Sequence, residues 1–419
     1  MARRPRRDPR MVTLANNLGL TGLSNHVEEN FQNRYWEYEK TLGMGGFGIA
    51  VLIKLKGILG PDAKRRAVKL ARSGREAELL KEIEILKTIN GASHVVSVLG
   101  TCDNLLQAVK DRRRGLMRII AGKNNTKTKN RVQKTTKRSN SSVLWRAGFF
   151  VWQQVRRQNR HKHNFPFDSF VGVGGPALAL EYLEYGDVDD LKNRLYTSEE
   201  NPNMPNRVLW SIFLCLIRAV IGMAYPIGQP IGGAQITETI PADGNLSTES
   251  KLTHNDIFPR NVMFAAGDGI QEHYIEAMAK LIDFGVANDG EGSPHNLYWC
   301  AQVINAIVVR GPLLTFGATW PYKGFPTRGV NLLGYPTPQK PNPLRIPYRW
   351  LDPELRDFLL TCLYEDPANR PTLSAALATA QNAVSNKTPD SFPEPARETD
   401  DAVRTFMQNF VLNVPRRRW

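Results

Sequence analysis

Thr253–Phe264, T-H-N-D-I-F-P-R-N-V-M-F, is the stretch that decides the fold of this chain. It places one carboxylate, Asp256, five residues before an amide, Asn261, in a short loop between apolar segments. A second apolar run, L-I-D-F-G at 281–285, carries another carboxylate, Asp283. Two acidic groups and an amide can hold a hydroxyl nucleophile and magnesium around a triphosphate. The two loops therefore predict a site for phosphate chemistry.

The composition is that of an ordinary globular protein. The chain has 419 residues, of which 42% are hydrophobic and 23% charged, enough for one large or two smaller domains. Its four scattered cysteines match neither a disulfide framework nor paired metal-ligand spacing, which predicts a reducing compartment. The basic N-terminus lacks the apolar stretch of a secretory signal, and the most apolar window, Leu209–Ile227, contains Arg218. We therefore expect an intracellular protein, cytoplasmic or nuclear, with a buried helix there and no membrane span.

The net charge of +15 comes from one segment. Residues 110–162 contain 17 Lys or Arg and one acid, so this segment carries +16 and the rest of the chain about −1. It lies in a basic insertion at about 103–168, whose middle, 122–142, is rich in Lys, Asn, Thr and Ser and predicts disorder. Aromatic residues in 143–155 beside these cations make nucleic-acid binding one hypothesis. A solvated insertion, a nuclear-import patch and translated non-coding sequence are the alternatives.

The loops of Asp256 and Asp283 resemble the catalytic loop and the metal-binding loop of eukaryotic-type protein kinases. The pattern H-N-D-I-F-P-R-N looks like that of the divergent kinase-like proteins of filamentous fungi, and the resemblance covers about residues 34–385 apart from the insertion. It implies an α+β, two-lobed fold: a small antiparallel β lobe with one helix and a larger helical lobe. It also implies ATP and Mg2+ as cofactors, with Asp256 orienting the substrate hydroxyl and Asn261 and Asp283 holding the metal.

A glycine-rich run, G-M-G-G-F-G at 43–48, follows a strand-like run, Trp36–Lys40, and precedes another, Ile49–Leu55. The resemblance implies a loop that covers the phosphates, because glycines let backbone N–H groups approach anionic oxygens. Its four glycines are Gly43, Gly45, Gly46 and Gly48. A dinucleotide-binding fold uses the same spacing, but a helix should then follow instead of a second strand. Ala50 replaces the valine that the family has after the last glycine.

The run R-A-V-K-L at 66–70 resembles the third-strand motif of the family, with Lys69 as the phosphate-binding lysine. A surface lysine on an edge strand is the alternative. The following segment, Glu76–Ile89, has apolar residues at helical spacing. Glu82 matches the helix glutamate that pairs with the lysine in the family, and Glu78 and Glu84 are its competitors.

The run L-E-Y-L at 180–183 resembles the hinge that bonds the adenine edge. Leu180 stands at the gatekeeper position, and the backbone around Glu181 and Leu183 provides the hydrogen bonds. Asp187 stands where the family often has an acidic residue near the ribose, although an ordinary loop aspartate is nearly as good an interpretation. The remaining nucleotide contacts that the resemblance implies are Ala67 and Met263.

Several residues depart from the family pattern. Asn255 replaces the arginine before the catalytic aspartate, which removes the usual link to a phosphorylated activation loop. Phe258 replaces a lysine that faces the transferring phosphate, and Arg260 stands where many tyrosine kinases carry a compensating arginine. We hypothesise that Arg260 supplies the missing charge and therefore also acts in catalysis.

The segment after Asp283 departs further. Asn296-Leu297-Tyr298 matches the start of the central helix with Asn296 in place of an aspartate, which leaves a very short activation segment and no Ala-Pro-Glu. The substrate-docking platform is therefore absent or rebuilt. The arginine that normally pairs with that glutamate persists as Arg370, which must find another acid or solvent.

These observations give one leading function and two alternatives. We expect a protein kinase that transfers the γ-phosphate of Mg-ATP to a protein hydroxyl, Ser/Thr more than Tyr, without switching by loop phosphorylation. A pseudokinase or ATP-binding interaction module is the second hypothesis, and nucleic-acid binding through the insertion is the third. The expected segments are a basic flexible leader (1–33), a small lobe (34–185) with the insertion, a helical lobe (186–385), and a C-terminal tail (386–419) with a helix over 401–414.

Overall fold

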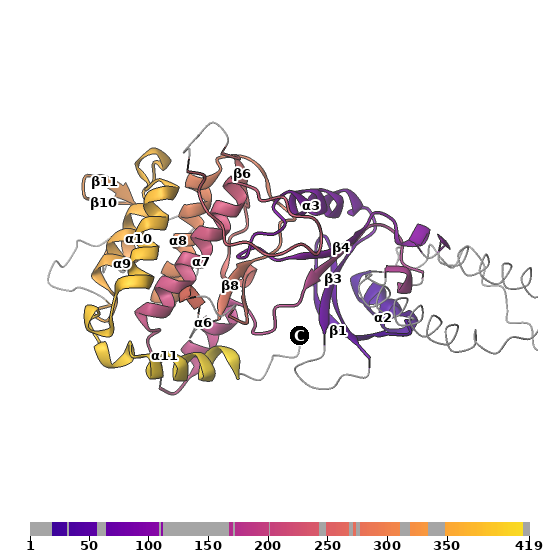
Figure 1. Cartoon of the computed structure of the whole chain (residues 1–419), viewed down its shortest axis with the longest axis horizontal. Coiled ribbons are helices and arrows are strands. Elements are labelled where there is room, and N and C mark those ends of the chain that lie inside the picture. The colour runs from indigo at the N-terminus through magenta and orange to yellow at the C-terminus, as the bar shows by residue number, and fades with distance from the viewer. Residues whose placement is uncertain are drawn as a thin grey trace, which may run out of the picture. The chain divides into compact units, whose positions relative to one another are not determined.

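The computed structural model describes most of the chain as a mixed α+β protein (Figure 1). The described residues are 19–31, 33–56, 64–108, 110–111, 167–170, 172–200, 202–242, 249–267, 271–273, 277–310, 319–333 and 348–413. Contacts between Cα atoms divide the chain into two compact units. The first contains residues 1–83 and 98–182, and the second contains residues 84–97 and 183–418. The α+β class agrees with the sequence prediction.

The first unit is built on a five-stranded antiparallel sheet. Its strands are β1 (Trp36–Gly45), β2 (Gly48–Leu55), β3 (Arg65–Ala71), β4 (Val98–Cys102) and β5 (Ala177–Glu181), in the spatial order β1-β2-β3-β5-β4. Helix α3 (Glu76–Thr88) follows β3, and the division of the chain between the two units falls within it, after Ile83. Alternate residues of the central strands, such as Val51, Val68 and Leu70, are fully buried on one face of the sheet. That face forms the core of this unit, so the side chains between them lie on the other face.

A helix within the expected leader completes this core. Helix α2 (Leu20–Asn30) buries Leu23 and Val27 against the sheet beside Trp36. The expectation that residues 1–33 form a flexible leader is therefore wrong for 20–30. The helix is short and mostly polar, and its apolar side chains gain stability only by packing on β1 and β2, which a search for periodicity within the segment does not register.

The second unit is mainly helical. Its helices are α6 (Val188–Thr197), α7 (Asn206–Ala224), α8 (Ser293–Val309), α9 (Pro353–Cys362), α10 (Leu373–Asn386) and α11 (Asp400–Met407), and a π-helical turn, η10, spans Gln408–Leu412. Its short strands pair as β6 (Leu252–Thr253) with β9 (Asn288–Asp289), β7 (Val262–Ala265) with β8 (Met278–Leu281), and β10 (Trp320–Tyr322) with β11 (Phe325–Thr327). The 3-10 turns are η4 (Pro259–Asn261), η5 (Gln271–His273), η6 (Val330–Leu333), η7 (Pro367–Asn369), η8 (Pro389–Ser391) and η9 (Pro395–Arg397), and η2 (Phe167–Ser169) lies in the first unit.

Helix α7 is the central element of the second unit and contacts α8, α10 and β8. It is the one helix among the described residues that is long and apolar enough to cross a membrane, and 94% of its apolar window is buried inside the fold. Its single charged residue in that core, Arg218, is paired: Nε and Nη2 donate to the Glu272 carboxylate, and Nη1 donates to the Glu238 carbonyl oxygen. The prediction of a buried helix here is confirmed.

The C-terminal tail belongs to the second unit and does not form a separate segment. The buried carboxylate of Glu398 accepts hydrogen bonds from the backbone N–H groups of Asn206 and Arg207, at 2.8 and 3.0 Å. These are the unpaired donors at the N-terminus of α7, so the tail caps the central helix. The expected helix at 401–414 is α11, which begins at Asp400 and passes into η10 after Met407.

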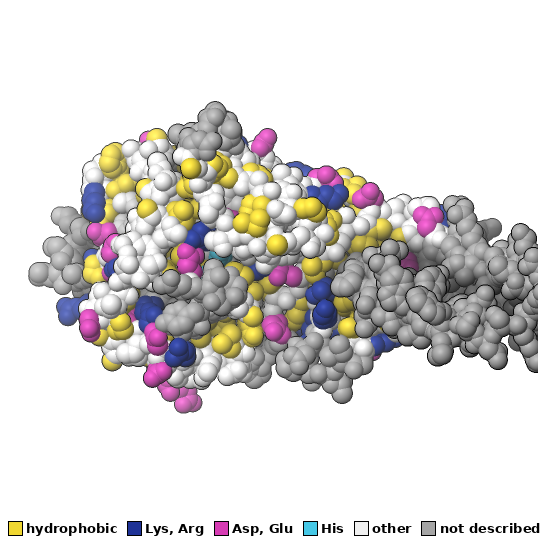
Figure 2. Space-filling view, in the orientation of Figure 1, with side chains coloured by type: hydrophobic (Ala, Val, Ile, Leu, Met, Phe, Trp, Pro, Cys, Tyr) yellow, Lys and Arg dark blue, Asp and Glu magenta, His cyan; other side chains and the backbone are white. Residues whose placement is uncertain are grey.

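The basic insertion remains a sequence prediction. Residues 112–166, which carry most of its charge, and residues 1–18 lie outside the described residues. On the face drawn in Figure 2, the acidic and basic side chains of the described residues are interspersed and do not gather into one basic patch. The hypothesis of nucleic-acid binding therefore rests on the sequence of the insertion alone.

Candidate active site

His254 joins the two loops that carry the predicted acidic residues, which we name the Asp256 loop (253–261) and the Asp283 loop (282–287). Its Nε2 donates a hydrogen bond to the Ile282 carbonyl oxygen at 3.0 Å, so its Nδ1 is the acceptor that receives the Asp256 backbone N–H at 3.2 Å. The imidazole is fully buried and makes an edge contact with the ring of Phe284, with 4.5 Å between centroids. One side chain thus fixes the backbone of both loops.

Asn296, at the start of α8, anchors the beginning of the Asp256 loop. Its Oδ1 accepts the His254 backbone N–H at 3.0 Å, and its Nδ2 donates to the Leu252 carbonyl oxygen at 2.8 Å. The side chain is buried, so both backbone groups depend on it for a partner that water would otherwise provide. The prediction that a helix begins in this segment is confirmed by α8.

Asp256 and Asn261 are held together within their loop. Asn261 is buried, and its Nδ2 donates to both the carbonyl oxygen and the Oδ2 of Asp256, each at 2.8 Å. Because the amide nitrogen is engaged in these bonds, Oδ1 is the atom that Asn261 offers to a ligand. The amide is therefore oriented with its hard oxygen donor turned away from Asp256.

Asp283 lies beside this pair through strand pairing. β7 and β8 are antiparallel with Val262 opposite Leu281, and the Ile282 N–H donates to the Asn261 carbonyl oxygen at 2.9 Å. Asp283, with φ 63°, and Asn255, also with φ 63°, adopt a left-handed backbone that is uncommon for residues other than glycine. Such conformations are often kept at functional sites. Carboxylate and amide oxygens are the donors that Mg2+ prefers, so the residues present fit that ion.

Arg260 and Phe258 form a layered arrangement next to Asp256. The Arg260 Nη2 donates to both oxygens of the Asp256 carboxylate, at 2.8 and 3.0 Å. The guanidinium carbon lies 4.5 Å from the centroid of the Phe258 ring, which in turn stacks on Trp299 at 5.7 Å. The aromatic pair therefore supports a cation that would otherwise be mobile, since the Arg260 side chain is 57% exposed.

Asn255 ties the Asp256 loop to the end of the Asp283 loop and to the segment that follows it. Its Nδ2 donates to Asn288 Oδ1 at 3.0 Å and to the Val286 carbonyl oxygen at 3.2 Å. The β6–β9 pair and the hydrogen bond from the Gly292 N–H to Thr253 Oγ1 hold the same segment, and α8 begins immediately afterwards. The segment between the Asp283 loop and α8 is therefore short, as the sequence predicts, and it is hydrogen-bonded to the Asp256 loop at Asn288 and Gly292; its role as an activation segment stays a prediction.

The glycine-rich run of the first unit is the turn of a β-hairpin. β1 and β2 pair up to Gly45 and Gly48, with Gly46 and Phe47 in the turn. The second element is a strand, as predicted, and this excludes the strand–turn–helix arrangement of a dinucleotide-binding fold. At Gly48 a Cβ atom would lie 1.9 Å from the Leu70 carbonyl oxygen, whereas at Gly43, Gly45 and Gly46 it would meet nothing within 4 Å.

Lys69 and Glu82 form an ion pair within the first unit. The Lys69 Nζ donates to both oxygens of Glu82, at 2.9 and 2.7 Å, and the Glu82 side chain is 2% exposed. The two competing glutamates pair elsewhere, Glu78 with Arg75 and Glu84 with Lys87. The choice of Glu82 as the partner of Lys69 is confirmed; its role in binding phosphate stays a prediction.

The predicted nucleotide contacts are divided between the two units. Gly43, Gly45, Gly46, Gly48, Ala67, Lys69, Glu82 and Glu181 belong to the first, and Leu183, Asp187, Asp256, Arg260, Asn261, Met263 and Asp283 belong to the second. In the first unit, Ala67 and Lys69 alternate along β3 with core residues and so share the opposite face of the sheet. Glu181 ends β5 opposite Arg66.

Asp187 is the N-cap of α6. Its Oδ1 accepts the Asp190 backbone N–H at 2.8 Å, and it lies beside Met263 in an isolated bridge between their chain segments. Burial raises the pKa of Asp187 to about 6, although the bond from Asp190 acts in the opposite direction. Capping of α6 is thus sufficient to explain the presence of an aspartate here, and no contact with a ribose is needed. This agrees with the interpretation of Asp187 as an ordinary structural aspartate.

Arg370 corrects a further expectation. The sequence predicts that Arg370 pairs with another acid or with solvent. Instead, three of its nitrogens donate to the carbonyl oxygens of Tyr364, Pro294 and Glu365 at 2.9–3.0 Å. Its guanidinium carbon also lies 4.7 Å from the centroid of the Tyr298 ring. Carbonyl dipoles and an aromatic face stabilise a delocalised cation well, so a buried acid is not required.

No protein-family model matches this chain, and no curated protein matches it in sequence.

Sequence reasoning did not single out His254 as the side chain that joins the two loops. The only signal was its position two residues before Asp256, within the same quoted stretch.

Proposed function

We propose that this chain is an ATP-dependent protein kinase that transfers the γ-phosphate of Mg-ATP to a protein hydroxyl, Ser/Thr in preference to Tyr. The observation that supports the proposal best is the network of the second unit. In it, His254 joins the loops of Asp256 and Asp283, and the Asn261 amide nitrogen donates to Asp256, which leaves the amide oxygen for a ligand. A carboxylate near a hydroxyl nucleophile and two oxygen donors for Mg2+ are the groups that phosphoryl transfer requires.

Each residue has a distinct task in this proposal. Bound Mg-ATP supplies the phosphoryl group and the cation that neutralises its oxygens. Asp256 accepts the hydrogen bond of the substrate hydroxyl and orients it. Asn261 and Asp283 hold the metal through their side-chain oxygens. Lys69, kept in place by the buried Glu82, binds phosphate oxygens in the same role that the lysine has in the family.

Arg260 takes over the charge of the absent lysine. Its guanidinium donates a hydrogen bond to Asp256 and packs on the ring of Phe258, which itself stacks on Trp299. A planar cation that lies next to the nucleophile-orienting carboxylate can stabilise the developing charge on the transferred phosphoryl group.

Asn255 supports the proposal that activity does not depend on loop phosphorylation. Its amide donates hydrogen bonds to Asn288 and Val286, so the end of the Asp283 loop and the segment after it are held by neutral hydrogen bonds. A phosphate group is not needed to order this segment.

A pseudokinase is the second candidate, and two observations favour it. The Asp256 carboxylate already accepts hydrogen bonds from Arg260 and Asn261, and the segment between Val286 and Gly292 is short and bonded back to the Asp256 loop. A protein of this kind would bind ATP without transferring phosphate.

The test is transfer of label from γ-labelled ATP by the purified full-length chain to generic Ser/Thr and Tyr substrates. Asp256→Asn is the test variant, and Asp357→Asn, which changes an exposed acid of α9, is the matched control. We expect Mg2+-dependent labelling of Ser/Thr that Asp256→Asn abolishes and Asp357→Asn retains. Labelling that survives in Asp256→Asn would contradict the assigned role, and ATP binding without any labelling would favour the pseudokinase.

A further inference from the structure

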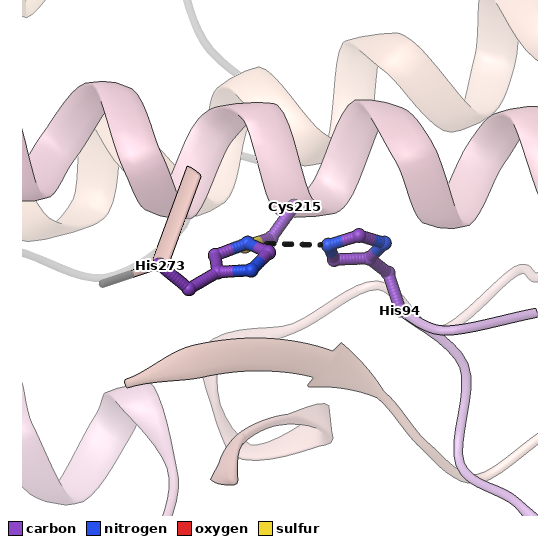
Figure 3. Close-up of side chains that lie close together, drawn as sticks. All are labelled: His94, Cys215 and His273. Atoms are coloured by element: carbon purple, nitrogen blue, oxygen red, sulfur yellow. Dashed lines mark hydrogen bonds between the residues drawn. The ribbon is translucent and has the colours of Figure 1, made fainter. Parts of the chain in front are cut away.

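Three side chains that the proposed kinase chemistry does not use converge inside the second unit (Figure 3). His94 lies in the segment between α3 and β4, Cys215 in α7, and His273 in η5. All three are buried: His94 is 0%, Cys215 1% and His273 2% exposed. Their ligand atoms point toward one another and lie within 4.8 Å of each other.

The distances between these atoms are short. His94 Nε2 lies 3.4 Å from His273 Nε2, and Cys215 Sγ lies 3.3 Å from His273 Nε2. A tetrahedral zinc ion with Zn–N of about 2.0–2.1 Å and Zn–S of about 2.3 Å separates two nitrogen ligands by about 3.3–3.4 Å and a nitrogen from a sulfur ligand by about 3.5–3.6 Å. Two of the three separations are therefore close to those between neighbouring corners of such a site, and the ligand atoms of His94 and Cys215 lie within 4.8 Å of each other.

A carboxylate behind His94 fixes the orientation of its ring. Glu238 is 1% exposed; its Oε2 lies 2.6 Å from His94 Nδ1, and its Oε1 accepts the His94 backbone N–H at 2.7 Å. A carboxylate bonded at Nδ1 keeps the proton on that nitrogen and leaves the lone pair of Nε2 directed at the cluster. Histidines that bind zinc are usually held by a carboxylate in this manner.

We propose that His94 Nε2, Cys215 Sγ and His273 Nε2 bind a divalent zinc-class ion, with Glu238 as the carboxylate that orients His94. Two imidazoles and a thiolate are a donor set that suits Zn2+ and not Mg2+ or Ca2+, which take oxygen ligands. A water molecule completes the four-coordinate shell. Because the three buried ligands come from separate segments, the ion would fasten the segment that carries His94 and the turn η5 to the central helix α7.

The simplest competing arrangement is a cluster held by hydrogen bonds alone. In that case the two facing Nε2 atoms share a proton, and added metal has no effect. The two arrangements differ in metal content and in the response of stability to metal, so both can be measured on the full-length chain.

The experiment uses the purified full-length chain. The protein is treated with a chelator, dialysed and titrated with Zn2+, and bound zinc is measured by elemental analysis together with the melting temperature. Co2+ in place of Zn2+ reports directly on a thiolate ligand through its absorption. We expect one zinc per chain, a higher melting temperature with Zn2+ than without, and thiolate–cobalt absorption.

Cys215→Ser is the test variant, and Cys362→Ser is the matched control, because Cys362 is equally buried in the same unit. We expect the first to lose the bound zinc and the thiolate–cobalt absorption, and the second to keep both. If Cys215→Ser fails to fold, the zinc titration of the wild type still shows whether the cluster binds zinc or is held by hydrogen bonds alone. A wild type without stoichiometric zinc and without a change in melting temperature would overturn the proposal, as would equal zinc loss in both variants.

Discussion

Arg260 donates hydrogen bonds to both oxygens of the Asp256 carboxylate, at 2.8 and 3.0 Å, while its guanidinium lies over the ring of Phe258. Phe258 stands where the kinase resemblance expects a lysine, so the cation next to the carboxylate comes from a different position of the same loop. Phe258 removes the charge of the expected lysine, but its ring also packs against Arg260, the residue that supplies a positive charge in place of that lysine.

Replacing Arg260 should therefore slow phosphate transfer. We expect Arg260→Ala to lower turnover about tenfold or more, which corresponds to about 1.4 kcal/mol of lost transition-state stabilisation. Arg260→Lys should restore only part of it, because an ammonium group lacks the planar face that stacks on Phe258. Arg404→Ala, which removes an exposed arginine of α11, is the control. Full turnover of Arg260→Ala would contradict the role assigned to this residue.

The Lys69–Glu82 pair should matter for stability as well as for nucleotide binding. Lys69→Met leaves the carboxylate of Glu82, 2% exposed, without its lysine, and we expect unfolding to become easier by about 3 kcal/mol. Lys87→Met breaks an exposed pair with Glu84 on the same helix and should cost less than about 1 kcal/mol. Denaturant unfolding of both variants measures the difference, and similar losses would count against a tightly coupled buried pair.

Much of the first unit was predictable from the sequence because its signals are local. The glycine run between strand-like segments predicts the hairpin, and helical spacing after β3 predicts α3 with Glu82 turned toward Lys69. The ordering of Asp256, Asn261 and Asp283 likewise predicts two neighbouring loops. In each case the deciding residues are close in the chain, or their order alone sets the arrangement.

Contacts between distant positions were not predictable in the same way. His94, Cys215 and His273 show no ligand spacing along the chain, and only the packing of three segments brings them together. Arg370 could not be paired from the sequence because its partners are backbone carbonyls, which every residue has. Helix α2 was overlooked because its stability comes from the sheet on which it packs.

Two glycines of the same hairpin should respond differently to alanine. At Gly48 the added Cβ would lie 1.9 Å from the backbone oxygen of Leu70, so β2 and β3 would have to separate, and we expect a loss of about 3 kcal/mol. At Gly45 the Cβ would meet nothing within 4 Å, and stability should change by less than about 0.5 kcal/mol. Thermal and denaturant unfolding of the two variants provides the measurement, and a Gly45→Ala variant as unstable as Gly48→Ala would contradict it.

The raised pKa of Asp187 predicts a pH effect on stability. Burial raises this pKa from 3.8 to about 6, so between these values the folded chain holds a proton that the unfolded chain has released. The stabilisation that this proton linkage gives to the folded chain is therefore fully present below about pH 4 and is lost as the pH rises through about 6. Asp187→Asn keeps an oxygen to cap α6 but cannot ionise, so its stability advantage over the wild type should grow from pH 4 to pH 7.

Unfolding free energies of the wild type and Asp187→Asn at a series of pH values measure this effect. A difference that stays constant from pH 4 to pH 7 would show that Asp187 does not titrate in this range.

The most direct test of the central claim is Mg2+-dependent binding of ATP, because it does not require the protein substrate to be known. Isothermal titration of ATP into the full-length chain, with and without Mg2+, should be made for the wild type, Asp283→Asn and Asp289→Asn. Asp289 is an exposed acid of β9 and serves as the matched control. We predict binding that Mg2+ strengthens, that weakens at least tenfold in Asp283→Asn, and that is unchanged in Asp289→Asn. A wild type that binds no ATP, or an Asp283→Asn variant that binds Mg-ATP as well as the wild type, would contradict the account.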